Sequence, residues 1–198
     1  MKTYQLTLTI AGSDSGGGAG IQADLKTFSA LGCYGMSAIT AITAQNTRAV
    51  TAIHPIPPEM VGAQIRAVLD DIGVDAVKIG MLNTPEVINE VARQLLHCPT
   101  PNIVLDPVMV AKSGDKLLRD EAVTALRKTL IPLAAIITPN IPEAEVLSGI
   151  EINSRQDMER AAASLLELGA KAVLLKGGHF STDQSPDCLV YQGSKAIW

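Results

Sequence analysis

The chain has 198 residues, of which 47% are hydrophobic and 18% charged, so one domain can bury a sizeable core. Its formal net charge of -4 provides no basic surface for nucleic acid, and no apolar run is long enough to span a membrane. Cys33, Cys98 and Cys188 lie far apart without metal-ligand spacing. We therefore expect a cytoplasmic protein with no disulfide framework, no nucleic-acid partner and no membrane attachment.

A glycine-rich stretch from Ala11 to Gly20 lies between an alternating apolar run (Leu6 to Ile10) and an apolar run of helical period (Ile21 to Leu31). This order predicts a strand, a glycine turn and a helix. Glycines add little bulk, so backbone N–H groups beside a helix N-terminus can close on a polar or negatively charged ligand. The first hypothesis is a ligand-facing loop. The alternative is that the glycines only let strand and helix pack closely.

The remaining chain alternates between strand and helix signals. Further strands are predicted at 36–44, 76–79, 103–105, 134–137 and 172–175, with a short extended flap at 50–56. Helices are predicted at 57–71, from 84, at 119–130, from 142 and at 154–168. Residues 36–44 are small, β-branched and uncharged, which is typical of a central strand covered on both faces. Residues 188–198 predict a hairpin that turns at Gln192 and Gly193. The alternation indicates an α/β fold with a mainly parallel sheet and helices on both faces.

Polar or glycine residues follow almost every predicted strand. In a parallel sheet these positions meet in one crevice at the carboxyl ends of the strands. They are Gly12 to Gly20, Gln45-Asn46, Gly80-Met81, Asp106, Asn140 to Glu143, and Lys176 to Gly178.

Two familiar phosphate-binding patterns fit this sequence poorly. Residues 18–23 satisfy a loose dinucleotide-binding pattern, but no acidic residue lies between Asp24 and Glu59 to bind the ribose. No Gly-Lys-Ser/Thr sequence follows the glycines, so the Walker A signature is also absent. An NAD-dependent oxidoreductase is therefore a poor alternative.

Asp106, Asn140 and Glu143 form a second constellation, because oxygen ligands at neighbouring strand ends suit Mg²⁺ and phosphoryl transfer. Lys176, at the end of an apolar strand, could place a cation on nucleotide phosphates. Structural alternatives stay open: Asp106 as a turn residue before proline, Glu143 as a carboxylate at a helix N-terminus, and Lys176 as a solvated side chain.

Six motifs together closely resemble the hydroxymethylpyrimidine and phosphomethylpyrimidine kinases of thiamine biosynthesis, within the ribokinase-like superfamily. The resemblance spans nearly the whole chain and implies a three-layer α/β/α fold. The motifs are Ala11 to Asp24, Thr43 to Thr47, Lys78 to Met81, Asp106 to Val110, Thr138 to Asn140 and Lys176 to His179. The first is highly specific, whereas the Asn140 and Glu143 pair is shared across the superfamily.

The resemblance implies ATP-dependent phosphorylation of 4-amino-5-hydroxymethyl-2-methylpyrimidine and then of its monophosphate. It places Gln45 on the aminopyrimidine, a role that suits an amide with both donor and acceptor. The structural alternatives are a strand-end cap for Gln45 and a core position for Met81. The implied pocket residues are Gly12, Asp24, Gln45, Met81 and Val108; Asp106 and Glu143 would organise Mg²⁺, and Asn140 and Lys176 would meet ATP phosphates.

The family also has a Gly-Thr-Gly-Cys segment that provides an anion hole and a cysteine proposed as the base, and the sequence to Trp198 contains no such segment. We expect one kinase domain over residues 1–198 that lacks this segment, has no catalytic base of its own and is C-terminally truncated. A non-catalytic pyrimidine-binding chain and a pyridoxal-type kinase of the same fold stay open as alternatives. Missing helices would leave apolar sheet surface that a homodimer could cover.

Adding a C-terminal segment that carries Gly-Thr-Gly-Cys should raise turnover by roughly 10² to 10³, the usual contribution of oxyanion donors. Single-turnover ADP release by the two forms would measure the difference. Equal rates would show that the segment is not required.

Overall fold

The computed structural model describes residues 4–98, 102–109, 120–178 and 185–198. Its main sheet has seven strands in the order β2-β1-β5-β6-β7-β8-β9. The first six pair in parallel, and β9 pairs antiparallel to β8. Parts of the predicted motifs, loops and helices lie outside the described residues: Val110, residues 112–115, Arg119 and His179. The parallel sheet confirms the predicted fold class.

Most predicted elements occur where the hydrophobic period places them. The strands are β1 (Leu6–Ala11), β2 (Tyr34–Ile39), β3 (Ala41–Gln45), β4 (Val50–Pro55), β5 (Ala76–Ile79), β6 (Ile103–Leu105), β7 (Ile136–Ile137), β8 (Ala172–Leu175) and β9 (Cys188–Tyr191). The helices are α1 (Gly20–Ala30), α2 (Pro58–Asp71), α3 (Pro85–Leu95), α4 (Asp120–Ala125), α5 (Ile141–Ser148) and α6 (Arg155–Leu166). The tail turns as predicted, because Leu189 and Ile197 form an antiparallel bridge.

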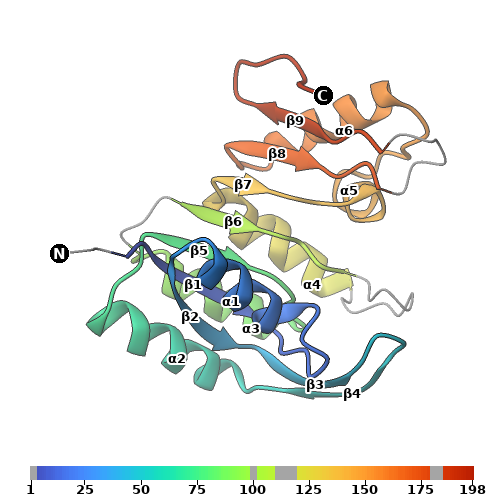
Figure 1. Cartoon of the computed structure of the whole chain (residues 1–198). Coiled ribbons are helices and arrows are strands. Elements are labelled where there is room, and N and C mark those ends of the chain that lie inside the picture. The colour runs from blue at the N-terminus through green and yellow to red at the C-terminus, as the bar shows by residue number, and fades with distance from the viewer. Residues whose placement is uncertain (1–3, 99–101, 110–119, 179–184) are drawn as a thin grey trace.

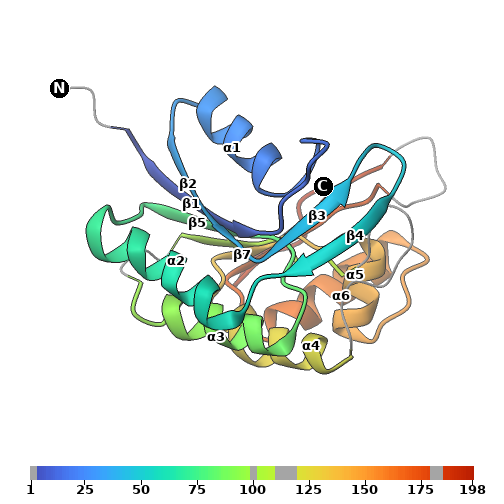
Figure 2. The same cartoon turned by 90° about the horizontal axis from the view of Figure 1, so that it is seen from below.

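Helices lie on both faces of the sheet, as Figure 2 shows. Helix α1 packs on β1 and β2 from one side, while α2 to α6 cover the opposite face. Inward-facing aliphatic side chains, among them Leu105, Ile137 and Val173, are fully buried beneath this second layer. The chain therefore builds its core mainly between the sheet and α2 to α6.

The face of the sheet toward α1 is polar on β1 and β5 and apolar on β6 and β7. Thr9 and Lys78 on β1 and β5 face α1, whereas their neighbours in register on β6 and β7 are Val104 and Ile136. Val104, Ile136 and Leu174 are half-buried, and α1 is the one helix of the described residues on that side. The described residues therefore cover this part of the sheet only partly.

The prediction of one central strand over residues 36–44 is wrong. The chain forms two strands, and β2 is an edge of the main sheet, while β3 pairs with β4 in a separate two-stranded flap (Figure 1). Thr40 separates the two strands: its N–H donates to the Ala11 carbonyl at 3.0 Å and its hydroxyl to the Met81 carbonyl at 2.8 Å. These distant partners redirect a sequence whose local strand pattern is continuous.

Two further boundaries differ from the sequence-based expectation. The predicted helix ending at Leu130 is α4 followed by a π-helical turn (Leu126–Leu130) and a 3₁₀ turn (Ile131–Leu133). Pro132 explains the change, because its ring has no N–H and crowds the carbonyl four residues earlier. Strand β7 is also shorter than predicted, since Ala134 instead ends the 3₁₀ turn.

Helix α1 can begin only on a glycine. Gly20 has φ +56°, and a Cβ at this position would overlap the Gly12 carbonyl oxygen and lie 3.3 Å from the Asp14 nitrogen. The Ile21 N–H donates to the same Gly12 carbonyl at 3.0 Å. A side chain at Gly20 would therefore separate α1 from the glycine loop, residues 12–19.

Gly20→Ala should lower the free energy of unfolding by more than the roughly 1–2 kcal/mol cost of left-handed backbone, because overlap with Gly12 adds to that cost. Gly32→Ala is the matched control, since Gly32 has φ +74° with no atom within 4 Å of an added Cβ. Urea unfolding of both variants measures the difference, and equal losses would contradict a steric role for Gly20.

Candidate active site

The glycine loop is folded around the side chain of Asp14. Gly16, Gly18 and Ala19 donate their backbone N–H groups to its carboxylate at 2.8, 2.9 and 2.8 Å. Asp14 is only 5% exposed, so these bonds replace the water that an isolated buried carboxylate would need. The sequence-based hypothesis assigned such amides to a ligand. These three amides already bind Asp14, so a ligand contact by the other residues of the loop stays a prediction.

The glycine loop is also fastened to flap strand β3. Ser13 donates its N–H to the Ala41 carbonyl at 2.8 Å, and the Thr43 hydroxyl donates to the Ser13 carbonyl at 2.8 Å. The Ser15 hydroxyl donates to the Gln45 carbonyl at 2.7 Å and accepts from the Gln45 N–H at 2.8 Å. The loop and the flap therefore form one continuous wall.

Three of the five predicted pocket residues lie along this wall. A Cβ at Gly12 would be 2.5 Å from the Met81 Cε and 3.7 Å from the Ala41 carbonyl oxygen, so the Met81 side chain would have to move for any larger residue at this position. Gln45 is further along β3 and is half-buried. Gly12 and Met81 thus meet after β1 and β5, while Gln45 lies beside Ser15 further along the same wall.

Val108 and Asp24 have other surroundings. Val108 is half-buried in the segment after β6, where its N–H donates to the Asp106 carbonyl at 2.8 Å. Asp24 lies between α1 and the sheet, where its Oδ2 accepts from the Thr9 hydroxyl at 2.6 Å and from Lys78 Nζ at 3.0 Å. This ion pair fixes the Asp24 side chain, and direct contact with a pyrimidine stays a prediction for both residues.

A charged cluster lies after β6, β7 and β8. Lys176 Nζ donates to Asp106 Oδ1 at 2.9 Å, and the Thr138 hydroxyl donates to the same oxygen at 3.2 Å. The Lys176 N–H bonds the Pro139 carbonyl at 2.8 Å, which joins the ends of β7 and β8. Lys176 is therefore paired with Asp106 and is not simply a solvated side chain.

Glu143 completes a capping box at the start of α5. The Asn140 N–H donates to Glu143 Oε2 at 2.8 Å, and the Glu143 N–H donates to Asn140 Oδ1 at 2.9 Å. Glu143 is only 4% exposed. Burial raises the pKa of its carboxyl, as does the negative charge of Asp106, while backbone bonds from Asn140 and Met109 and the charge of Lys176 lower it. Glu143 therefore has the position that the structural alternative described, a carboxylate at a helix N-terminus, and its metal role stays a prediction.

The chemistry of Asp106 and Glu143 fits a divalent cation. Both offer hard carboxylate oxygens, and their mutual repulsion is the kind of interaction that a cation relieves. Within the described ranges no group of three or more histidine, cysteine, aspartate or glutamate side chains could hold a metal. Two carboxylates with phosphates and water are the usual magnesium environment.

None of the helices in the described ranges is both long and apolar enough to cross a membrane.

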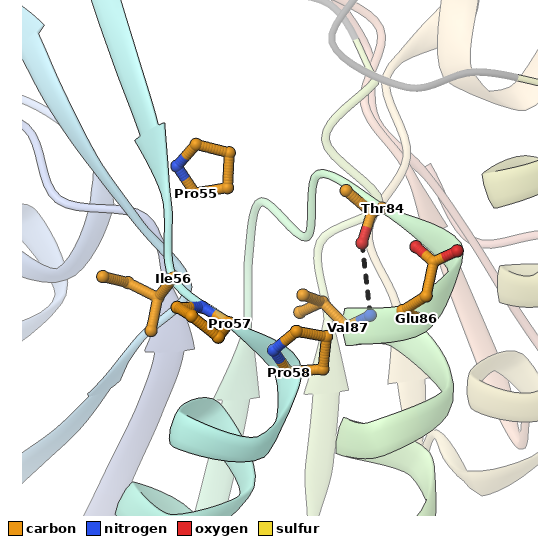
Figure 3. A pocket seen from close by; sticks show the side chains of 7 residues that line it. All are labelled: Pro55, Ile56, Pro57, Pro58, Thr84, Glu86 and Val87. Carbon is orange, nitrogen blue, oxygen red and sulfur yellow. Dashed lines mark hydrogen bonds between the residues drawn. The ribbon is translucent and has the colours of Figure 1, made fainter.

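A separate hollow of about 420 Å³ lies at the base of the flap (Figure 3). Its wall consists of Pro55 to Pro58 on one side and Thr84, Glu86 and Val87 of the first turn of α3 on the other. The Thr84 hydroxyl caps α3 by accepting from the Val87 N–H at 3.3 Å. No predicted site residue lines this hollow, which is mainly apolar.

Sequence reasoning missed several residues that position the site. Asp14 and the two threonines Thr43 and Thr138 were not assigned any role. A signal was present for Thr43, because it precedes Gln45 by two positions and alternate strand residues share a face. Thr138 directly follows a strand, as Asp106 does. The sequence gives only a weak indication that Asp14 binds the amides of its own loop, because Ser-Asp-Ser-Gly also fits an ordinary turn.

The parallel sheet, the flap and the strand-end carboxylates define a ribokinase-like α/β kinase. The profile of the phosphomethylpyrimidine kinase family matches residues 14–198. A hydroxymethylpyrimidine/phosphomethylpyrimidine kinase of Bacillus subtilis is 52% identical over 194 residues, which cover 98% of this chain and 71% of that protein. The chain belongs to the phosphomethylpyrimidine kinase family.

Solved structures agree with this assignment. A crystal structure of phosphomethylpyrimidine kinase from Clostridium difficile has a TM-score of 0.89 and 55% identity, covering 96% of this chain and 82% of that one. The pyridoxal kinase of Staphylococcus aureus in complex with AMP-PCP has a TM-score of 0.89 and 39% identity, covering 98% of this chain and 71% of that one. The chain thus shares its fold with a phosphomethylpyrimidine kinase and with a pyridoxal kinase.

Relative to the parent protein, the Glu143→Gln variant should gain unfolding free energy as the pH rises toward neutrality. Because the pKa of Glu143 is raised in the folded state, the folded protein holds its proton more tightly than the unfolded chain. That stabilisation is fully present below the ordinary value of 4.5 and is lost as the pH rises through the raised pKa, whereas glutamine keeps a neutral side chain throughout. Urea unfolding at acidic and neutral pH measures the change.

Glu151→Gln, which changes an exposed glutamate, is the control for the general effect of removing one charge. If the difference in unfolding free energy between Glu143→Gln and the parent protein does not change with pH, burial does not set the protonation of Glu143.

Proposed function

We propose that the chain binds ATP and phosphorylates 4-amino-5-hydroxymethyl-2-methylpyrimidine and its monophosphate, as a kinase of thiamine biosynthesis. One observation carries this proposal: two chemically different clusters occupy the same strand-end edge of the sheet. Gly12 and Met81 after β1 and β5, with Gln45 on the adjoining flap, form an uncharged group, and Asp106, Glu143 and Lys176 form a charged group near β6 to β8. The first suits a neutral ring and the second suits phosphates.

The uncharged group would bind the pyrimidine. A glutamine amide can donate to and accept from an aminopyrimidine edge, and a methionine side chain can pack on a ring. The Met81 side chain lies against Gly12, the first residue after β1. We infer that Val108 completes this pocket and that Asp24 supports it through its pair with Lys78.

The charged group would bind the nucleotide. We infer that Asp106 and Glu143 organise Mg²⁺ directly or through water, and that the bound ion would neutralise phosphate charge. The Lys176 ammonium lies 2.9 Å from Asp106 Oδ1, beside the expected cation site. Its remaining N–H donors can bind a phosphate oxygen. Asn140 uses its side-chain oxygen in the capping box, which leaves its amide N–H groups as donors for phosphate. The AMP-PCP complex of the related pyridoxal kinase supports nucleotide use.

The residues of this chain position both substrates, and none is proposed as the general base. Cys188 illustrates why: burial and the charge of Glu159 raise the pKa of its thiol to about 11, which keeps it protonated and inert. Cys33 and Cys98 are half-buried and lie outside both clusters. The proposed chemistry therefore requires a base and oxyanion donors of the Gly-Thr-Gly-Cys type. Cytoplasmic location and self-association also stay proposals.

Gln45→Ala should weaken pyrimidine binding by about tenfold or more, which is the effect of losing roughly one to two net hydrogen bonds. Its effect on ATP affinity should be small, because Gln45 is on the flap side of the site, away from Asp106 and Lys176. Isothermal titration with each ligand separates the two affinities.

Gln192→Ala, in the exposed turn after β9, is the control for removing a glutamine. Equal losses of pyrimidine and ATP affinity in Gln45→Ala would count against its place in the pyrimidine pocket. Parallel titrations with pyridoxal test the alternative substrate, and tighter binding or faster phosphorylation of pyridoxal would replace the proposed one.

A further inference from the structure

The Thr43 hydroxyl lies between two potential acceptors. Its Oγ1 is 2.8 Å from the Ser13 carbonyl oxygen and 3.2 Å from Oε1 of the Gln45 side-chain amide. Thr43 is only 6% exposed, and its own N–H donates to Ser13 Oγ at 3.3 Å. Water therefore has little access to the Thr43 hydroxyl, so the hydroxyl takes its partners from the protein.

One hydroxyl proton cannot serve both acceptors equally well. A hydroxyl has one donor and two lone pairs, and a buried carbonyl without a partner is costly. The shorter contact to Ser13 takes the proton. The Gln45 amide then satisfies its own contact best by placing its NH₂ group toward Thr43, because that group donates to the free lone pairs of the hydroxyl. The nitrogen and oxygen of an amide have nearly the same shape, so hydrogen bonding decides which one faces a neighbour.

We propose that Thr43 is a positioning residue that sets the orientation of the Gln45 amide and thereby the hydrogen-bond pattern that the pocket can recognise. In this orientation one amide proton is directed to Thr43, while the carbonyl oxygen and the second proton are left for a ligand. The other contacts of Gln45 with Ser15 involve only its backbone and do not favour either orientation. No further partner of the Gln45 amide occurs in the part of the chain that the structure describes.

The consequence concerns substrate choice and rests on the proposed function. An aminopyrimidine presents an exocyclic N–H donor beside a ring-nitrogen acceptor, which matches an amide that offers an oxygen beside one remaining N–H. The corresponding 4-oxo pyrimidine presents an oxygen beside a ring N–H, which is the reverse pattern. Thr43 thus selects the amino compound, because an amide turned by half a rotation would match the oxo compound instead.

Amide orientation can be measured without any substrate. The side-chain NH₂ signals of Gln45 are assigned in a ¹⁵N-labelled protein by their loss in Gln45→Ala. We expect nuclear Overhauser contacts from these protons to the Thr43 side chain, and protection of one proton from exchange that falls by about tenfold in Thr43→Val. Thr43→Ser retains the hydroxyl and should keep the protection. Absence of the contacts, or equal protection in Thr43→Val and the parent protein, would overturn the proposal.

Affinity measurements with two pyrimidines are the second test of the proposal. The ratio of affinities for 4-amino- and 4-oxo-5-hydroxymethyl-2-methylpyrimidine should fall by about tenfold in Thr43→Val and be retained in Thr43→Ser. Ser15→Ala is the matched control, because it removes another hydroxyl bond between the loop and β3 without touching the amide. Its affinities should fall for both compounds, with their ratio unchanged.

The two arms separate the possible failures. An unchanged ratio in a folded Thr43→Val protein, or the same loss of ratio in Ser15→Ala, overturns the selective role of Thr43. If the parent protein binds neither pyrimidine, the proposed function fails, and the nuclear Overhauser contacts alone decide whether Thr43 orients the amide.

Discussion

The arrangement of the candidate site depends on one buried carboxylate. Asp14 is almost fully inaccessible to water, yet the N–H groups of Gly16, Gly18 and Ala19 point at it from less than 3 Å. Charge-assisted hydrogen bonds of this kind are about twice as strong as neutral ones. They give the glycine loop a definite shape before any ligand arrives, and this shape allows Ser13 and Ser15 to reach β3.

The second cluster is organised by charge instead of backbone amides. Asp106 and Lys176 are 70 residues apart in sequence and form an ion pair at the ends of β6 and β8. Glu143 is buried beside them, and its raised pKa reflects both desolvation and the Asp106 charge. Like-charge repulsion between carboxylates makes a site that gains stability from a bound cation. An ion-paired cluster therefore follows β6 to β8, apart from the glycine loop and the flap.

Local patterns predicted most elements of the fold. The alternation of β5, α3 and β6 follows from hydrophobic period and from the Thr84-Pro85 helix start, and the structure confirms each of them. The break at Thr40 could not be predicted in this way, because the residues around it form a continuous strand pattern. Only its hydrogen bonds to Ala11 and Met81, which are distant in sequence, redirect the chain.

The candidate site shows the same limit. Sequence motifs selected Gln45, Asp106, Glu143 and Lys176, and the structure brings the last three together. The motifs did not show that the glycine amides bind Asp14, because which acceptor an amide meets depends on the path of the loop. Partner choice among polar groups is a three-dimensional property, whereas strand and helix periods are local.

The flap is fastened at its base and again near the end of β3, and this makes it a fixed wall. At the base Thr40 bonds Ala11 and Met81, its carbonyl accepts from the Ile56 N–H at 3.0 Å, and the nearby prolines restrict φ where β4 passes into α2 (Figure 3). At the end of β3 the Gln45 backbone bonds the Ser15 hydroxyl. A ligand that enters beside Gln45 meets a surface that is already ordered. Little conformational entropy is lost on binding, so more of the contact energy is available as affinity.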